Sequence, residues 1–194
     1  MKINKAPLLL ENENIYLRPL RMEDINDEYI NGLNDPEVNE YLVNVRLETQ
    51  TRETVEDYVR SNLDSPSSVL FGIFIKNDPA DFIGTVRVSG IDYFHYYASI
   101  GVCLFAKKSW KKGYALQAIE LVKNYLFNAL RLHYLEAGVY EMNENSVNLF
   151  LRAGFNENYR VRSKFRYTDS FADVIFFSAI SHFFDESILK NKLS

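Results

Sequence analysis

Four lysines lie within residues 107–113, between an apolar stretch and an amphipathic one. The apolar stretch from Ile100 to Phe105 is typical of a strand buried on both faces. The stretch from Gly113 to Leu130 repeats apolar residues at three- and four-residue steps, which predicts a helix with one face on a core. The lysines would then stand at a helix N-terminus, where backbone N–H groups are unpaired and the partial charge is positive. An anion with several oxygens would satisfy both features, whereas a solvated basic turn is the alternative without a ligand.

Two familiar phosphate-binding loops do not fit this stretch. The P-loop needs two spaced glycines followed by Lys-Ser or Lys-Thr, and the dinucleotide fingerprint needs three glycines. Gly113 is the only glycine between residues 107 and 113. Any anion site here must therefore be of another kind.

Three motifs in order resemble the GNAT family of N-acetyltransferases. The residues Trp110-Lys111-Lys112-Gly113-Tyr114-Ala115 resemble its acetyl-CoA pyrophosphate loop, Q/R-x-x-G-x-G/A. Downstream, the stretch 143–155 resembles the N-x-x-S and "lyeklGF" signature of a branch that includes ribosomal-protein alanine, spermidine and amino-sugar acetyltransferases. The stretch 15–20, followed by Asp24, resembles the start of the same domain. The resemblance covers about residues 12 to 181.

Composition sets the class of protein. The chain has 194 residues, 47% hydrophobic and 25% charged, as expected for one globular domain over residues 1–194 with its core at about 12–181. A net charge of -4 argues against a nucleic-acid binder. The sequence has neither a leader segment nor an apolar run of about 20 residues, so we expect a cytoplasmic protein with no membrane partner. Monomer and homodimer both stay open.

Cysteine and histidine usage indicates neither a disulfide framework nor a metal site. The single cysteine, Cys103, lies inside the apolar strand and is interpreted as a small buried residue rather than a catalytic thiol. The three histidines, His95, His133 and His182, are scattered without ligand spacing. We therefore expect no metal.

The order of elements predicts a mixed α/β (α+β) fold. Strands are expected over 15–20, 69–76, 82–89, 100–105, 134–140, 159–167 and 171–180, and helices after Asp24 to 33, around 38–42, and over 51–63, 113–130 and 146–152. Asp24 is expected to cap the first helix, residues 77–80 to form a hairpin turn and residues 90–96 to connect two strands. The resemblance implies a central, mostly antiparallel sheet flanked by helices, with a splay between the fourth and fifth strands that holds the pantetheine arm.

The resemblance also implies which groups bind acetyl-CoA, the acetyl-donor cosubstrate. Backbone groups of Val102, Cys103 and Leu104 would hold the pantetheine arm, and N–H groups from Lys111, Lys112, Gly113, Tyr114 and Ala115 would hold the pyrophosphate. Trp110 replaces the family's Gln or Arg, and Lys111 stands where a second glycine is common. Asn143 would make a polar contact and Arg152 would reach a CoA phosphate. From the residues alone, Asn143 is equally a turn former and Arg152 a solvated helix residue.

The proton chemistry departs from the family pattern at two positions. Phe150 stands where many members have a tyrosine acid, which leaves Ser146 to protonate the thiolate unless Ser146 only caps its helix. Ser99 stands where many members have a glutamate. Glu141 is then our candidate base, with a surface carboxylate as the alternative. The loop residue His95 and a water chain are further options for the base.

The acceptor pocket is expected between residues 33–50 and 90–96, which carry several carboxylates and tyrosines. The acids favour a cationic amine, whereas the tyrosines would also suit a sugar or nucleotide. Basic residues alternate late in the chain and are predicted to share one strand face, where they could meet an acceptor phosphate: Arg160, Arg162, Lys164 and Arg166.

These patterns favour acetyl-CoA-dependent transfer of acetyl to a primary amine. A nucleotide-linked amino sugar stands slightly ahead of a protein N-terminus or a polyamine. A non-catalytic GNAT-fold module that binds CoA is the alternative, because Phe150 and Ser99 both depart from the catalytic pattern.

Overall fold

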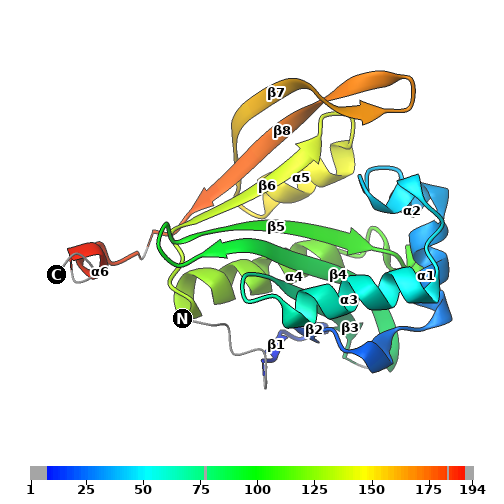
Figure 1. Ribbon diagram of the computed structural model, residues 1–194. Coiled ribbons are helices and arrows are strands. Elements are labelled where there is room, and N and C mark those ends of the chain that lie inside the picture. Colours follow the sequence, from blue (N-terminus) through cyan, green and yellow to red (C-terminus); the bar gives the residue numbers. More distant parts are fainter. Residues whose placement is uncertain (1–7, 77, 183, 191–194) are drawn as a thin grey trace.

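An eight-stranded sheet is the centre of the computed structural model, which describes residues 8–76, 78–182 and 184–190. The strands lie in the order β1-β2-β3-β4-β5-β6-β8-β7 (Figure 1). Neighbouring strands are antiparallel except for β5 and β6, which are parallel. The strands are β1 Leu10–Glu11, β2 Ile15–Pro19, β3 Val69–Ile75, β4 Asp78–Asp92, β5 Tyr97–Leu104, β6 Tyr134–Tyr140, β7 Asn156–Tyr167 and β8 Ser170–Ile180.

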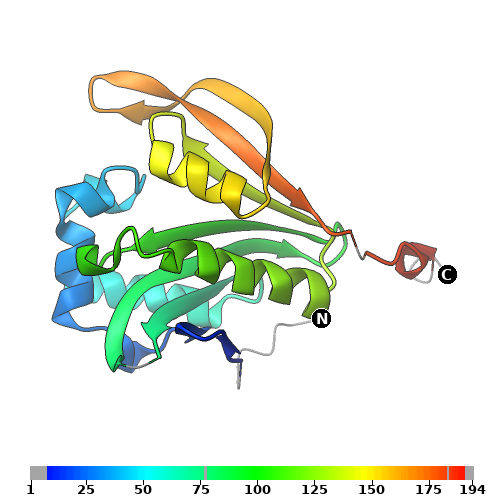
Figure 2. The same ribbon diagram turned by 180° about the vertical axis from the view of Figure 1, so that it is seen from behind.

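Helices cover both faces of this sheet, which confirms the predicted mixed fold. Helices α1 and α3 lie on one face, and α4 and α5 lie on the other (Figures 1 and 2). The apolar stripe of α4 buries Ile119 and Val122 completely, as its three- and four-residue spacing predicts. The α-helices are α1 Asp27–Asn34, α2 Pro36–Asn39, α3 Arg52–Asp64, α4 Tyr114–Asn124, α5 Glu144–Arg152 and α6 Ser187–Lys190. Short 3-10 turns lie at η1 Met22–Asp24, η2 Val45–Leu47 and η3 Lys107–Ser109, and a π-helical turn lies at η4 Tyr125–Ala129.

The predicted splay lies between β5 and β6. These strands are in register only from Tyr97 opposite Tyr134 to Ser99 opposite Glu136. Beyond Ser99 the two strands diverge, and the sheet opens between them (Figure 1). The short strand β1 is not among the expected strands, and its presence makes β5 and β6 the fifth and sixth strands of the chain.

Several boundaries differ from the expectation. Strand β4 continues through Gly90 to Asp92, because its pairing with β5 resumes after a register shift. The long helix stops being α-helical at Asn124 and closes with a π turn, in which the Leu130 N–H donates to the Tyr125 carbonyl. Strand β4 already begins at Asp78, inside the predicted hairpin turn, and residue 77 lies outside the described residues.

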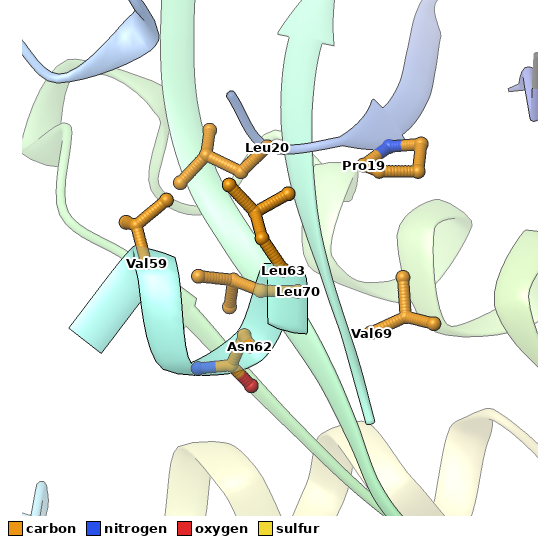
Figure 3. Close-up of a pocket in the computed structure, with 7 residues that line it drawn as sticks. All are labelled: Pro19, Leu20, Val59, Asn62, Leu63, Val69 and Leu70. Atoms are coloured by element: carbon orange, nitrogen blue, oxygen red, sulfur yellow. The ribbon is translucent and has the colours of Figure 1, made fainter. Parts of the chain in front are cut away.

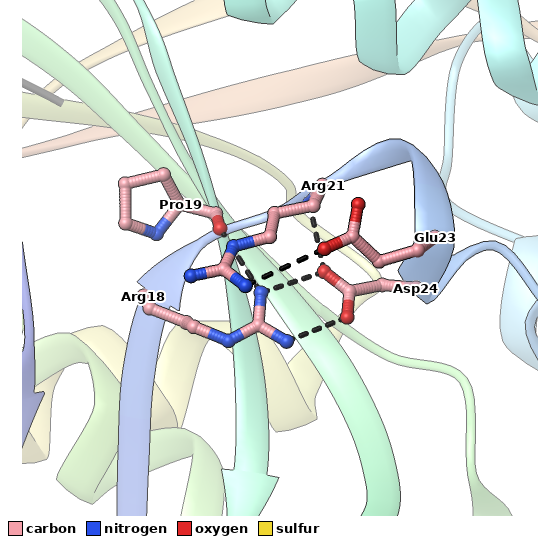
Figure 4. Close-up of polar contacts among 5 residues, drawn as sticks. All are labelled: Arg18, Pro19, Arg21, Glu23 and Asp24. Atoms are coloured by element: carbon pink, nitrogen blue, oxygen red, sulfur yellow. Dashed lines mark hydrogen bonds and ion pairs between the residues drawn. The ribbon is translucent and has the colours of Figure 1, made fainter. Parts of the chain in front are cut away.

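Asp24 is not the cap of α1. Asn26 is the cap, and its Oδ1 accepts the Tyr29 N–H at 2.8 Å. The Asp24 carboxylate instead receives both Nη atoms of Arg18, at 2.6 and 2.7 Å, and the Arg21 N–H at 2.7 Å (Figure 4). This fork-shaped pair fixes the end of β2 to the turn before α1 and raises the pKa of Arg18.

Candidate active site

The N-terminus of α4 lies just beyond the C-terminal end of β5 and has no side-chain cap. Its N-cap residue is Gly113, in the left-handed region at φ 81°, and its first turn holds no acidic residue. Helices α1, α2, α3 and α5 all have a side-chain cap and an acidic residue in the first turn. The first-turn N–H groups of α4 can therefore bind an external anion.

Trp110 holds the preceding loop against β5. Its indole Nε1–H donates to the Leu104 carbonyl at 2.8 Å. The next residue, Lys111, adopts a left-handed φ of 61°, which explains why a glycine suits this position. The loop is thus fixed by an internal hydrogen bond, and Lys111 and Lys112 extend from it as exposed side chains.

The four lysines of this loop fall into two pairs with different surroundings. Lys107 lies 2.7 Å from Asp35, and Lys108 lies 2.6 Å from Asp81, so these two ammonium groups bind the protein's own carboxylates. Within residues 8–76, 78–182 and 184–190, no carboxylate lies within 4.0 Å of the ammonium groups of Lys111 or Lys112. Lys111 and Lys112 are therefore the two lysines of this loop that remain available for an anion.

Three β5 residues lie beyond the last β5–β6 pair, at the edge of the opening. Val102, Cys103 and Leu104 are paired with β4 on one side only. Burial raises the pKa of the Cys103 thiol to about 12, so the thiol stays protonated at neutral pH. Cys103 is therefore a poor nucleophile, as its sequence context predicts.

The N-terminus of α5 follows β6 and is capped by Asn143. The Asn143 Oδ1 accepts the N–H of Ser146 at 3.1 Å. Ser146 is the third residue of α5 and not its cap, which removes the purely structural explanation for its hydroxyl. Arg152, in the last turn of the same helix, is exposed. Phe150 is only 3% exposed and packs on the rings of Phe155 and Phe177.

The two candidate bases have different surroundings. The exposed Glu141 forms an ion pair with Arg160, so this carboxylate would have to leave its partner to accept a proton. His95 is also exposed, and its backbone N–H donates to Asp92 Oδ1 at 2.9 Å.

Two residues that the sequence patterns do not mark lie along β6. Glu136, opposite Ser99, accepts hydrogen bonds from the hydroxyls of Tyr97 and Tyr159, each at 3.3 Å. Tyr140 is 4% exposed, and its buried hydroxyl has no hydrogen-bond partner among the described residues. The register of β5 and β6 brings Glu136 to Ser99, 37 positions earlier in the chain (136 minus 99), and no local spacing carries that information.

An aromatic cluster surrounds Tyr140 and joins the two halves of the molecule. Tyr41 lies 6.0 Å from the Tyr140 ring and stacks on Tyr167 at 5.9 Å, measured between ring centroids. The Tyr167 hydroxyl donates to Glu40 at 2.6 Å, and the Arg46 guanidinium lies 4.8 Å from the Tyr167 ring. The segment after α2 thereby packs against the β7–β8 hairpin. It lies near the C-terminal end of β5, where Lys107 meets Asp35, whereas residues 93–96 lie at the N-terminal end of β5, so residues 33–50 and 90–96 do not face each other across one pocket as expected.

The late basic residues do not share one face, so that expectation is wrong. Arg160 lies opposite Ile175, whereas the Lys164 ammonium lies 4.1 Å from the ring centre of Phe176. Neighbouring residues of β8 point to opposite faces, and Ser163, at φ 49°, interrupts the alternation of β7. Arg166 lies opposite Phe171 and therefore stays on the face of Arg160, so the predicted row is interrupted at Lys164.

A small depression lies away from the opening, between the end of α3 and strands β2 and β3 (Figure 3). Asn62 is its only polar lining residue; the others are Pro19, Leu20, Val59, Leu63, Val69 and Leu70. Its side chains are those with which α3 packs on the sheet, so we interpret it as a packing seam.

Residues 14–156 match the acetyltransferase (GNAT) domain family. The chain belongs to the GNAT family. The uncharacterized N-acetyltransferase p20 of Bacillus licheniformis is 29% identical over 174 residues, which cover 88% of this chain and 95% of p20. The uncharacterized N-acetyltransferase YoaA of Bacillus subtilis (strain 168) is 28% identical, over 77% of this chain and 83% of YoaA.

Solved structures of other GNAT enzymes have the same fold. Spermidine N-acetyltransferase from Vibrio cholerae, in complex with CoA and spermine, matches with a TM-score of 0.77 at 22% identity, over 88% of this chain and 97% of that one. Ribosomal-protein-S5-alanine acetyltransferase from Vibrio fischeri matches with a TM-score of 0.76 at 20% identity, over 92% and 99%. Together with the family match, these relatives make this GNAT protein an acetyl-CoA-dependent acyltransferase.

Within the described residues, none of the helices is long and apolar enough to cross a membrane. The same residues contain no group of three or more potential ligands that would hold a metal ion.

Proposed function

We propose that this GNAT enzyme transfers acetyl from acetyl-CoA to a small primary amine by direct attack in a ternary complex. The observation that carries the proposal is the uncapped N-terminus of α4 at the mouth of the β5–β6 opening. A pyrophosphate there would meet the N–H groups of Lys111 to Ala115 and the ammonium groups of Lys111 and Lys112. Residues 1–194 would act as one domain, because a single sheet joins Leu10 to Ile180.

The remaining cofactor contacts flank the same opening. The free edge of β5 at Val102, Cys103 and Leu104 would pair with the pantetheine arm. Asn143 keeps a polar side chain at the start of α5, and Arg152 is free to reach a CoA phosphate. Bound acetyl-CoA supplies the activated acetyl group, and the chain orients it.

Direct attack is favoured over an acetyl-enzyme. Cys103 is the only cysteine in the sequence, and its raised pKa makes it a poor nucleophile at neutral pH. Two bound reactants held in contact need no covalent intermediate, and their orientation supplies much of the rate.

We assign the proton donor for the leaving thiolate to Ser146. Its hydroxyl is half-buried in the first turn of α5 and is not used as a cap. Glu141 remains the candidate base of the sequence analysis, and its ion pair with Arg160 makes it the weaker of the two assignments.

The acceptor class narrows toward a cationic amine. The case for a nucleotide-linked amino sugar depends partly on a row of basic residues along β7 that could bind its phosphates. The bulge in β7 turns Lys164 out of that row, which weakens the case. The partly buried carboxylate of Glu136 instead suits an ammonium group on a polyamine or on a peptide N-terminus.

Thiol release from acetyl-CoA tests this function. The panel would contain 4-amino sugar nucleotides, spermidine, free amino acids and peptides with N-terminal Ala, Ser or Met. We expect turnover with spermidine or a peptide amine. Acetyl-CoA binding without turnover on any amine would instead favour the non-catalytic CoA-binding module, which the buried Phe150 and Ser99 leave open.

A further inference from the structure

A carboxylate without a cationic partner lies at the point where β5 and β6 part. Glu136 is partly buried, and the hydroxyls of Tyr97 and Tyr159 donate to its two oxygens at 3.3 Å each. No lysine, arginine or histidine nitrogen among the described residues lies within 4.0 Å of this carboxylate. Two neutral donors compensate a buried negative charge only partly, so the site favours a cation.

Glu136 borders two glycines, and the surface over one of them, Gly101, is open. Ser99 and Glu136 are the last register partners, and Gly101 and Gly138 follow two residues later on the same face. A Cβ placed on Gly101 would meet no atom within 4 Å. The floor beside the carboxylate is therefore bare on the β5 side, and on the β6 side Phe176 lies 3.2 Å from a Cβ at Gly138.

This floor lies on the opposite face of the sheet from the proposed cofactor helices. Arg87, the register partner of Gly101, donates to Asn62 of α3, which places Gly101 on the α3 face. Helices α4 and α5 lie on the other face (Figure 2). A thioester entering from the α4 side through the opening would meet a molecule held on the α3 side beside Glu136.

We infer that Glu136 binds the ammonium group of the acceptor amine and accepts its proton before attack. The inference rests on the proposed function and names Glu136 as its base in place of Glu141, whose carboxylate is ion-paired with Arg160. Two stacked ring pairs lie beside the carboxylate: Tyr97 with Tyr134 at 6.0 Å and Tyr159 with Phe176 at 4.6 Å. Each stack leaves only the outer ring faces for a cation, and the Lys164 ammonium already lies 4.1 Å from the Phe176 ring centre. This arrangement presents one carboxylate and several aromatic faces to a single ammonium.

The step balances in atoms and charge. The acceptor ammonium gives one proton to Glu136, and its nitrogen forms the C–N bond to the acetyl carbon as the C–S bond breaks. A second N–H proton passes to the CoA thiolate, by way of the proton donor. The products are the acetamide and CoA thiol, and Glu136 returns its proton to water.

The titratable groups that face Glu136 come from three strands. They are Tyr97 of β5, Tyr134 of β6 itself, and Tyr159 and Lys164 of β7, while β8 contributes Phe176 and Ser178. Burial and the Glu136 charge raise the pKa of Tyr97 to about 12, so Tyr97 remains a donor over the working pH range. Tyr97 can therefore keep its hydrogen bond to the Glu136 carboxylate while the amine is bound.

The test compares Glu136→Gln with Glu157→Gln, a matched exposed carboxylate whose partner is Arg160. CoA-saturated protein is titrated with 1,4-diaminobutane by calorimetry. We expect Glu136→Gln to weaken binding about tenfold or more, as for loss of a charge-assisted hydrogen bond, and Glu157→Gln to leave it unchanged. Equal affinity in wild type and Glu136→Gln, or no binding by wild type, would overturn the inference.

Turnover supplies a readout that a purely structural role would not change. With 1,4-diaminobutane, Glu136→Gln should lower kcat about 100-fold at neutral pH, and the loss should shrink as the pH rises. With O-methylhydroxylamine, which is already neutral, the loss should be less than about fivefold, because this amine needs no base. Equal losses with both amines would rule out the proton-accepting role. If wild type releases no CoA with any amine, the proposed function fails, and the calorimetry still decides whether Glu136 binds ammonium.

Discussion

Two parallel strand-to-helix units border the opening, and their helix N-termini are built in opposite ways. In the first unit, β5 leads to α4, which begins at the uncapped Gly113 with Lys111 and Lys112 nearby. In the second unit, β6 leads to α5, which is capped by Asn143 and carries Glu144 in its first turn. A capped N-terminus with an acidic residue is satisfied within the chain, whereas an uncapped basic one is satisfied by water or, more favourably, by an external anion. The difference supports the proposal that the first unit binds the cofactor phosphates and that the second contributes side-chain chemistry.

The largest expected effect concerns Cys103, in the strand of the first unit. If the positive charge at α4 acted on this thiol, its pKa would fall, but burial raises it from 9.0 to about 12. At pH 8 the thiolate fraction should be roughly a thousandfold smaller than for an ordinary cysteine, and alkylation correspondingly slower. Iodoacetamide labelling from pH 7 to 10 measures this, with the guanidinium-unfolded chain as control. Fast labelling of the folded protein would show that the positive charge at the N-terminus of α4 lowers the pKa of the Cys103 thiol.

Gly113→Pro should break the first unit. Proline fixes φ near −65°, whereas Gly113 adopts 81°, and the substitution also removes an N–H. We expect acetyl-CoA affinity to fall about a hundredfold or more, since each lost hydrogen bond to a charged group contributes about 1.5–3 kcal/mol. Gly154→Pro is the matched control, because Gly154 follows α5 with a φ of 79°. Equal acetyl-CoA affinity in both variants would refute the assignment of the pyrophosphate to α4.

Ser146→Ala should lower kcat while leaving acetyl-CoA affinity unchanged. A general acid contributes about a hundredfold, and water can replace part of that, so we expect a loss between about tenfold and a hundredfold. Since Asn143 caps α5, the substitution should not unfold the helix. The competing donor is the unpartnered hydroxyl of Tyr140. An unchanged kcat in Ser146→Ala, with a loss in Tyr140→Phe, would move the acid from α5 to β6.

The sequence predicted the first unit well because its parts are local. The apolar run and the helical spacing that predict β5 and α4 lie within about thirty consecutive residues, and the proposed phosphate contacts are main-chain groups that tolerate side-chain change. The expected burial of the strand on both faces is wrong from Gly101 to Leu104, which are partly exposed. The cap of α5 at Asn143 is equally local. The residues alone do not decide between a turn-forming role for Asn143 and a contact to the cofactor.

The acceptor side could not be predicted in the same way. Glu136 meets Ser99 through strand register, Lys107 meets Asp35 across more than seventy residues, and the turn at Ser163 reverses the expected face of Lys164. A pattern read along the chain contains none of these pairings. The side-chain pairings on the acceptor side therefore follow only from the folded structure, whereas the proposed main-chain site could be predicted from the sequence.

The smallest expected effect separates charge from strain in the α4 loop. Lys111 adopts a left-handed φ of 61°, which costs a non-glycine residue about 1–2 kcal/mol, and glycine's extra freedom when unfolded offsets part of the relief. Lys111→Gly should therefore raise the free energy of unfolding by about 0.5–1 kcal/mol, while acetyl-CoA affinity falls a few-fold because one ammonium is lost. Lys112→Gly removes the same charge from a residue that does not have a positive φ. It should therefore lower acetyl-CoA affinity to a similar degree without raising the free energy of unfolding. Denaturant unfolding with acetyl-CoA titration measures both quantities, and the same stability change in the two variants would mean that Lys111 carries no strain. A stabilised Lys111→Gly with weaker binding would show that the chain keeps a strained lysine there for its charge.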